Sequence, residues 1–288
     1  MNDRLSFNTV GSLDQYFKQS LASWDPQEAL FIRKWIWEGL YQLATHEVMQ
    51  DPHQKLTESE ILKGHFAIKE VLKGVPIQYV VGEVPFANAQ LMVNSHVLIP
   101  RPETEELIFK VKQRIHREHV KMVDIGTGSG CIAIALAKEN PTWEVWGYDI
   151  SVEALAVANA NAIKNNVAVS FEQFDILNDQ KTFLGFGCLV SNPPYIPQSE
   201  MEQMDSTVWE YEPHLALFTP NDDPLLFYKA IFSFSQLQVL SKGWVALETH
   251  YQFAHEVAAI WSQTNEWETF VEQDLQGKDR FVFAQRKS

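Results

Sequence analysis

The segment Ser191-Asn192-Pro193-Pro194-Tyr195 follows the apolar run Cys188-Leu189-Val190 and carries the most specific chemistry in the chain. Two successive prolines fix the backbone and remove two N–H donors. The Asn192 side-chain oxygen and the Pro193 carbonyl are then left as outward acceptors, and Tyr195 adds a flat face for a planar group. The pattern predicts a site that holds an NH₂ group.

A site of this kind suits group transfer to a planar nitrogen. Fixing the two hydrogens of an amide or base amine aligns its lone pair with a donor carbon, and we expect a methyl sulfonium as that donor. Positive charge that develops on the attacking nitrogen strengthens both hydrogen bonds in the transition state. The alternative is structural, a Pro-Pro turn after a strand with Asn192 as a local cap.

A second motif, Asp124-Ile125-Gly126-Thr127-Gly128-Ser129-Gly130, joins an apolar strand to a helix. Glycines let the backbone turn tightly and approach a ligand, and the start of a helix offers unpaired N–H groups. The motif predicts a nucleotide-like cofactor, although Cys131 stands where a dinucleotide site would have a small residue. A tight strand-to-helix turn without a ligand is the alternative. The candidate cofactor-binding residues here are Gly126, Thr127, Gly128, Ser129 and Gly130.

Acidic residues end the next two predicted strands. Asp149 lies where a parallel sheet places an acceptor for ribose hydroxyls, and Asp175 is suited to accept from an adenine amine at the same edge. Each alone would more often be a turn or cap residue, but their order after the glycine-rich loop favours an adenosine cofactor. We assign the adjoining Ile150 and Ile176 to the same site.

Strands and helices alternate from residue 120 onward. Such alternation gives a mainly parallel sheet covered by helices on both faces. The predicted strands are 120–126, 144–150, 169–175, 188–195 and 243–249, with closing strands near 268–271 and 280–284. The predicted helices are 129–138 and 152–165, then segments near 225–240 and 253–261.

The preceding residues divide into a helical part, 1–74, and an extended part, 75–98. Asp25-Pro26-Gln27-Glu28 and Thr57 to Glu60 are helix-start signals, and Gly74 is a stop signal. We expect Trp24, Trp35 and Trp37 to pack in a small helical core, with a docking surface as the alternative. The β-branched segment Pro76-Ile77-Gln78-Tyr79-Val80-Val81 and the runs after it predict a β-hairpin linker.

Charge is distributed unevenly along the chain. There are 37 acidic and 23 basic residues, for a net charge of −14. Between Lys181 and Lys229 the chain has no Lys or Arg, which disfavours direct nucleic acid binding and favours a basic protein partner. An acidic solvated loop is the alternative. The acids of this segment are Glu200, Glu202, Asp205, Glu210, Glu212, Asp222 and Asp223.

Other classes are disfavoured by what the sequence lacks. No apolar run approaches the roughly 18 residues of a membrane-spanning helix, and the first residues do not read as a secretory signal. Two cysteines build no disulfide framework, and the nine histidines show no metal-site spacing. We expect a cytoplasmic protein that needs no metal and no membrane.

These motifs, together with Ile99-Pro100-Arg101-Pro102-Glu103-Thr104-Glu105, resemble the release-factor glutamine methyltransferases, the HemK or PrmC family. The resemblance implies an α/β fold: a seven-stranded Rossmann-like methyltransferase domain (99–288) after a helical bundle (1–74) and a hairpin linker (75–98). It implies S-adenosylmethionine as cofactor, S-adenosylhomocysteine as product and no metal. The implied reaction methylates the side-chain amide nitrogen of the glutamine in the Gly-Gly-Gln motif of class 1 peptide chain release factors.

Residue by residue, the resemblance implies that Gly126 to Gly130 bind the cofactor and that Asp149 holds its ribose. Asn192, Pro193, Pro194 and Tyr195 are the implied amide site. Ile176 replaces an aromatic residue found in some members, so we expect weaker stacking on adenine. We expect the helical bundle and the acidic segment to recognise the release factor. Further matching segments are Gly82 with Phe86, Glu212-Pro213, Ala216-Leu217 and residues 277–280.

Three other functions compete with this one. An enzyme that methylates the exocyclic amine of adenine in DNA would use Asn192 to Tyr195 equally well, but the acidity of the chain and its missing basic patch disfavour it. A non-catalytic cofactor-binding module would be expected to lack Asn192 or the glycines. An NAD-dependent oxidoreductase has no evident use for an acceptor-rich proline turn.

Overall fold

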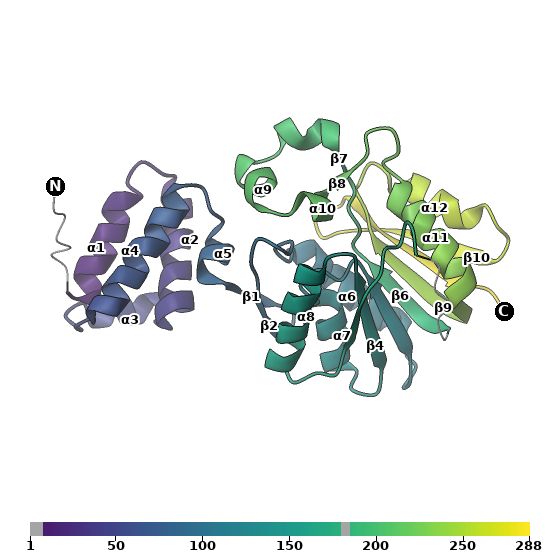
Figure 1. Cartoon of the computed structure of the whole chain (residues 1–288), viewed down its shortest axis with the longest axis horizontal. Coiled ribbons are helices and arrows are strands. Elements are labelled where there is room, and N and C mark those ends of the chain that lie inside the picture. The colour runs from purple at the N-terminus through teal and green to yellow at the C-terminus, as the bar shows by residue number, and fades with distance from the viewer. Residues whose placement is uncertain (1–7, 180–184) are drawn as a thin grey trace. The chain divides into compact units, whose positions relative to one another are not determined.

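The computed structural model describes residues 8–179 and 185–288. The chain forms two compact units, Met1–Glu83 and Val84–Ser288, and each is described by itself (Figure 1). None of the helices in the described ranges is long and apolar enough to cross a membrane.

The first unit is helical, as predicted. Asp25 caps its second helix by accepting hydrogen bonds from the backbone of Gln27 and Glu28, and Thr57 and Glu60 form the predicted capping box. Both signals are local in the sequence, and both hold in the structure. The helices are α1 (Val10–Ser20), α2 (Pro26–Trp35), α3 (Thr45–Gln50), α4 (Glu58–Leu72) and α5 (Ile77–Val81), with a π-helical turn, η1 (Ile36–Leu40), after α2.

The core of this unit contains Trp37, one of the three tryptophans predicted to pack there. Trp37 is fully enclosed, and its indole N–H donates to Asp14 Oδ1 at 3.0 Å. Arg33 also binds Asp14. Burial by itself would raise the pKa of Asp14, but hydrogen bonds from Lys18, Arg33 and Trp37 hold that pKa below its usual value. Trp24 and Trp35 pack against the same core, half-buried.

The extended conformation predicted for Pro76 to Val81 is wrong, because Ile77–Val81 forms the short helix α5. Pro76 precedes its first residue, and Gly82, at φ +82°, ends it in a left-handed conformation. Burial of Ile77 in the helical core outweighs the β-propensity of the valines. The boundary between the units therefore falls at Glu83 and Val84 rather than at residue 74.

A hairpin follows, but it is docked on the second unit rather than free as a linker. Its strands are β1 (Glu83–Phe86) and β2 (Ala89–Met92). The side-chain amide of Asn161 donates to Met92 O and accepts from Met92 N, and Asn165 does the same with Gln90. Asn161 of helix α8 (Val152–Lys164) and Asn165, which caps the C-terminus of that helix, thus pair with the open edge of β2 as a further strand would.

The second unit is built on a seven-stranded sheet with the order β10-β11-β9-β6-β3-β4-β5, as the resemblance implied. The pairs β9–β6, β6–β3, β3–β4 and β4–β5 are parallel, whereas the pairs β10–β11 and β11–β9 are antiparallel. Strand order reverses between β3 and β6, and ligands of such sheets bind outside the carboxyl ends of the strands at that point. The strands are β3 (Lys121–Ile125), β4 (Glu144–Asp149), β5 (Ser170–Gln173), β6 (Phe186–Ser191), β9 (Val239–Glu248), β10 (Trp267–Gln273) and β11 (Asp279–Arg286).

Helices cover both faces of this sheet (Figure 1). On β11, Phe281 and Phe283 face α6, whose Lys110 and Arg114 lie over their rings, while the alternating Val282 packs in a cluster with Trp261 on the other side. One layer holds α6 (Pro102–Arg114), α7 (Cys131–Glu139) and α8 (Val152–Lys164), and the other holds α11 (Leu226–Gln238) and α12 (Ala254–Ser262). Sequence reasoning missed α6, although Pro102 at its first position was a signal.

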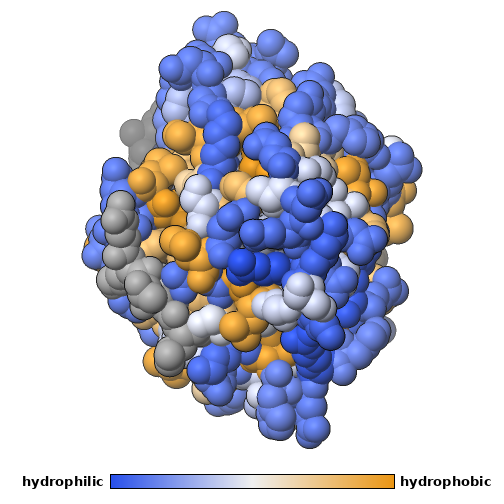
Figure 2. Space-filling model, turned by 90° about the vertical axis from the view of Figure 1, so that its right-hand side faces the viewer, coloured by the Kyte–Doolittle hydropathy of each residue, from blue (hydrophilic) through white to orange (hydrophobic). Residues whose placement is uncertain are grey.

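The segment after the proline motif contains short elements. Strand β7 (Ile196–Pro197) pairs in parallel with β8 (Phe218–Thr219). Between them lie a 3₁₀ helix, η2 (Gln198–Gln203), and the helices α9 (Ser206–Tyr211) and α10 (His214–Leu217). The face of the second unit shown in Figure 2 is mostly hydrophilic with separate apolar spots, which is ordinary for a protein surface.

Candidate active site

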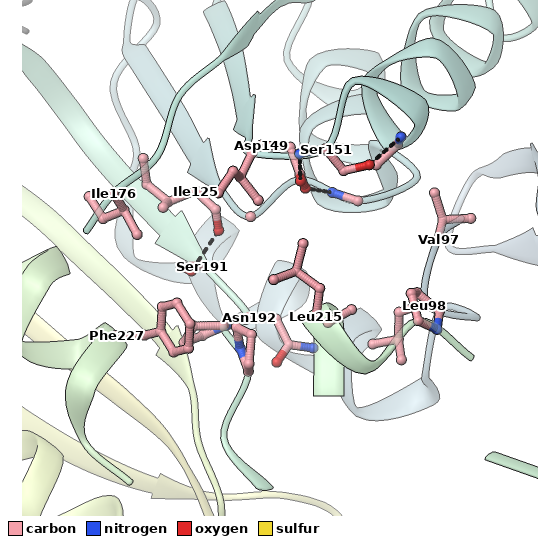
Figure 3. Close-up of a pocket in the computed structure, with 18 of the residues that line it drawn as sticks. Val97, Leu98, Ile125, Asp149, Ser151, Ile176, Ser191, Asn192, Leu215 and Phe227 are labelled. Carbon is pink, nitrogen blue, oxygen red and sulfur yellow. Dashed lines mark hydrogen bonds between the residues drawn. The ribbon is translucent and has the colours of Figure 1, made fainter. Parts of the chain in front are cut away.

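A cavity of about 280 Å³ opens at the carboxyl ends of the parallel strands, where the strand order reverses (Figure 3). It brings together the ends of β3, β4 and β6 with the segment after β5. Of the residues predicted from the sequence, the cavity is lined by Gly126, Gly128, Asp149, Ile150, Asp175, Ile176, Asn192, Pro193 and Pro194.

The glycine-rich turn needs its glycines for two different reasons. Gly126 and Gly128 have φ of +71° and +54°, and a Cβ on either would meet no atom within 4 Å, because both face open space. Gly130 has φ +81°, but a Cβ there would lie 3.0 Å from Ile134 and 3.2 Å from Ala158. The first two glycines therefore leave room for a ligand, and the third lets α7 pack closely.

Three residues predicted to bind the cofactor lie outside the cavity lining. Thr127 is buried and donates to Asp124 Oδ2 at 2.7 Å, and the Ser129 hydroxyl is buried with no hydrogen-bond partner in the described part of the chain. Gly130 is the N-cap of α7. These three residues are part of the turn itself, and binding of the cofactor by their backbone stays a prediction. Burial raises the pKa of Asp124 to about 7 despite the Thr127 hydrogen bond.

Asp149 fixes the turn to the end of β4. Its Oδ2 accepts the Gly128 N–H at 2.8 Å, and its Oδ1 accepts the Ser151 N–H at 2.9 Å (Figure 3). Burial raises the pKa of Asp149, and these backbone hydrogen bonds oppose the rise. A carboxylate has about four acceptor sites, so Asp149 keeps capacity for donors in the cavity.

Asp175 and Ile176 follow β5 and line the same cavity. The oxygens of Asp175 accept from Leu177 N and from the Asn178 side chain, both within their own turn. Ile176 contributes an apolar side chain to the lining, and so does Phe227 (Figure 3). A contact of Asp175 with an adenine amine stays a prediction.

The proline motif begins directly after β6. Ser191 is buried, and its hydroxyl donates to the Ile125 carbonyl at 2.6 Å, which ties the end of β6 to the end of β3. Asn192 Nδ2 donates to Thr104 Oγ1 of α6 at 3.2 Å. The nitrogen of this amide is thus engaged within the protein, which leaves Oδ1 as the acceptor for a ligand.

Tyr195 is placed differently from the other residues of its motif. It does not line the cavity, and its hydroxyl donates to Glu248 Oε1 at 3.3 Å. Burial raises the pKa of Tyr195 well above its usual value, and the nearby Glu248 carboxylate raises it further. A stacking contact of this ring with a substrate amide stays a prediction.

The opposite wall of the cavity comes from two segments to which sequence reasoning gave no role in the site. Residues 95–98 form one part, and Pro213, Leu215 and Ala216 form the other. Glu212, which is buried, binds Arg101 and accepts the Ile99 N–H at 3.1 Å, so it joins the two segments. Glu212-Pro213 and Ala216 belong to segments that match the family pattern, but nothing in the sequence indicated that they meet residues 95–98.

Sequence comparisons agree with this geometry. The family described as "Methyltransferase small domain" matches residues 103–210. A curated "Release factor glutamine methyltransferase" of Flavobacterium psychrophilum is 36% identical over 271 residues, covering 92% of this chain and 95% of that protein. The protein of the same name from Bacillus subtilis is 38% identical and covers 82% and 83%.

Among solved structures, a methyltransferase from Pyrococcus furiosus shares the fold. Its TM-score is 0.51 at 15% identity, and the match covers 69% of this chain and 89% of that one. Strand order, glycine-rich turn and carboxyl-end cavity define an α/β methyltransferase. Within that class, the chain belongs to the release factor glutamine methyltransferase family.

Proposed function

We propose that this protein uses S-adenosylmethionine to methylate the side-chain amide nitrogen of the glutamine in the Gly-Gly-Gln motif of class 1 peptide chain release factors. The observation that supports this most directly is the orientation of Asn192. Its amide nitrogen is engaged by Thr104, so its oxygen is the acceptor available at the cavity that Asp149 and Gly128 also line. The name of the relatives, release factor glutamine methyltransferase, supports a glutamine of a release factor as the substrate.

The cavity fits the chemistry of the proposed cofactor. Open space at Gly126 and Gly128 admits a ligand close to the backbone, and Asp149 offers a fixed carboxylate for two ribose hydroxyls. Ile150 and Ile176 give apolar contact suited to the faces of adenine. When bound, S-adenosylmethionine supplies an electrophilic methyl group on a sulfonium sulfur, and S-adenosylhomocysteine is left.

Asn192 and Pro193 carry the chemical step by positioning. An amide nitrogen is a weak nucleophile because its lone pair is shared with its carbonyl. Asn192 Oδ1 and the Pro193 carbonyl accept its two hydrogens and aim the lone pair along the line of attack. Both hydrogen bonds strengthen as the nitrogen becomes positive, so they stabilise the transition state more than the bound substrate. After the methyl group has moved, the nitrogen loses one of its two hydrogens as a proton, which leaves a neutral N-methyl amide.

In the described part of the chain, no three His, Cys, Asp or Glu side chains are grouped as a metal site requires. The proposed step uses none, and the absence of a metal requirement stays a prediction.

Recognition of the release factor is assigned to the acidic segment and to the helical unit. Glu202, Glu210 and Asp222 are exposed, and they offer negative charge to a basic partner. Glu212 cannot serve in this way, because it is buried against Arg101. Asp223 is paired with Lys229. The recognition surface is therefore smaller than the sequence run of acids.

The decisive experiment offers several acceptors to one enzyme preparation. The protein is incubated with S-adenosylmethionine and, separately, a purified class 1 release factor, the same factor with its motif glutamine changed to alanine, and duplex DNA. We expect mass spectrometry to locate one added methyl group on the motif glutamine of the first acceptor alone. Methylated adenine in the DNA, or a methyl group elsewhere in the release factor, would overturn the proposal.

A further inference from the structure

A chain of hydrogen bonds runs behind Asn192, on the side away from the cavity. Asn192 Nδ2 donates to Thr104 Oγ1 at 3.2 Å, and Thr104 Oγ1 donates to Glu248 Oε2 at 2.7 Å. Thr104 and Glu248 are 2% and 1% exposed, and neither lines the cavity. They reach Asn192 from different elements, the first turn of α6 and the last residue of β9.

The sheet itself places Glu248 beside the motif. Strands β6 and β9 are parallel, with Ser191 opposite Leu247. The next residues, Asn192 and Glu248, therefore leave the sheet at neighbouring positions. The signal in the sequence was an acidic residue directly after the apolar run Trp244-Val245-Ala246-Leu247, and sequence reasoning assigned it no role.

The order of donors in this chain is fixed by chemistry. A carboxylate has no hydrogen to give, and a threonine hydroxyl has only one. With Glu248 ionised, that hydrogen must go to Glu248, so Thr104 Oγ1 can only accept a hydrogen bond from Asn192. Only the nitrogen of the Asn192 amide can donate it.

We infer that Glu248, acting through Thr104, sets which way the Asn192 amide faces and thereby keeps Oδ1 turned to the substrate. Both are positioning residues, and the inference rests on the proposed function. Shape cannot make this choice, because the terminal torsion of asparagine is broad and nearly two-fold. If the amide were flipped, its NH₂ group would face the NH₂ group of the substrate. The site would then lose Asn192 Oδ1 as an acceptor.

The charge of Glu248 governs how firmly the amide is held. Burial raises its pKa to about 7, while the Thr104 hydrogen bond and the positive Arg280 oppose the rise. Protonated Glu248 can donate to Thr104, which frees the threonine hydrogen to bind Asn192 Oδ1 in the flipped amide. The other titratable groups around Glu248 are Glu103, Cys131, Tyr195 and Tyr228, and Asp274 is paired with Arg280.

Three variants test the inference in the full-length protein with a purified release factor. Thr104→Val keeps the shape and removes the hydroxyl, Thr104→Ser restores it, and Thr219→Val is the control. Thr219 is equally buried, and its hydroxyl has no partner in the described residues. We expect Thr104→Val to lower kcat about 5- to 10-fold, the effect of one hydrogen bond, with Thr104→Ser and Thr219→Val within about 2-fold of wild type.

Two further readouts separate positioning from folding and from binding. The Kd for the release factor, measured without cofactor, should be the same for Thr104→Val and wild type, and so should KM. The second readout is the pH profile: kcat of wild type should fall as pH drops below about 7, whereas Glu248→Gln, which cannot titrate, should lack this fall.

Each outcome has one meaning. A wild-type protein that methylates no release factor refutes the proposed function. If the wild type is active and Thr104→Val has the same kcat, the inference is overturned. It is also overturned if Thr219→Val lowers kcat as much as Thr104→Val does. If Thr104→Val does not fold, the pH profiles decide, because the same acid-side fall in wild type and Glu248→Gln would overturn it.

Discussion

Glu212 is paired with Arg101 across more than a hundred residues of sequence. The Arg101 guanidinium binds one carboxylate oxygen, and the Ile99 N–H binds the other at 3.1 Å. Glu212 is buried, whereas Arg101 is one-third exposed. Because residues 95–98 and Pro213, Leu215 and Ala216 line the cavity, one buried carboxylate joins the two segments that form this wall of the site.

Glu212→Gln should therefore weaken both the fold and the cofactor site. The substitution removes the negative charge that faces Arg101. It also replaces one buried carboxylate oxygen, an acceptor, with an NH₂ group, a donor. We expect a loss of about 1–3 kcal/mol in the free energy of unfolding and weaker cofactor binding by calorimetry. Glu144→Gln, in the exposed pair with Lys121, is the control and should cost less than about 1 kcal/mol. Equal effects of the two substitutions would contradict the role of Glu212.

Asn192→Ala should abolish most turnover while it leaves the fold intact. The side chain lies at the cavity, and in the proposed function it supplies one of two acceptors for the substrate amide. Loss of one preorganised polar group costs roughly 10²–10³ in kcat. Single-turnover assays with saturating cofactor measure this, and a thermal melt checks the fold. Near-normal turnover would show that positioning by Asn192 is not the source of catalysis.

Gly128→Ala should reduce cofactor affinity beyond its cost in stability. The left-handed backbone costs a residue with a Cβ about 1–2 kcal/mol, and at Gly128 that Cβ would point into the open space of the cavity. Gly277→Ala is the matched control, because its φ is +80° and its surroundings are equally open, but it lies outside the cavity. Both variants should lose similar stability. Only Gly128→Ala should weaken cofactor binding, and equal affinities would refute this assignment.

Asp124→Asn should change how stability depends on pH. The pKa of Asp124 is raised from 3.8 to about 7 by burial, so between these values the folded state binds more protons than the unfolded state. Stability then falls as pH rises through this window. Asp124→Asn lacks this titrating group. Its free energy of unfolding, relative to that of the wild type, should therefore increase by up to a few kcal/mol as the pH rises from 4 to 7. Urea unfolding at several pH values measures the difference, and a constant difference would show that Asp124 has the same pKa in both states.

Reversing the charge of Glu202, Glu210 and Asp222 to lysine should slow association with the release factor. These acids are exposed, whereas Asp205 is left unchanged because it caps α9. We expect about a 10-fold lower association rate at low salt, measured by stopped-flow fluorescence. Reversal of Glu118, Glu256 and Glu268, which are also exposed, gives the same net charge. If both triple variants slow association equally, net charge and not this surface is responsible.

Much of the candidate site could be predicted from short segments of the sequence. The glycines of the turn, the acid that ends β4 and the proline motif after β6 are each encoded within a few residues. Carboxyl ends of neighbouring parallel strands meet at one edge, so their order along the chain was enough to predict that Gly128, Asp149 and Asn192 share a cavity.

Tertiary structure decided what surrounds these residues. Thr104, Glu212 and Glu248 reach the site from elements 88 to 144 residues away from their partners, and no local pattern encodes such pairings. Burial in the helical core also turned the β-branched Ile77–Val81 into a helix. Hydrogen-bond partners and burial depend on how the whole chain packs, whereas turns and caps depend on residues next to each other. For that reason the sequence alone predicted candidate binding residues that share the cavity, and only the fold showed which hydrogen-bond partners orient them.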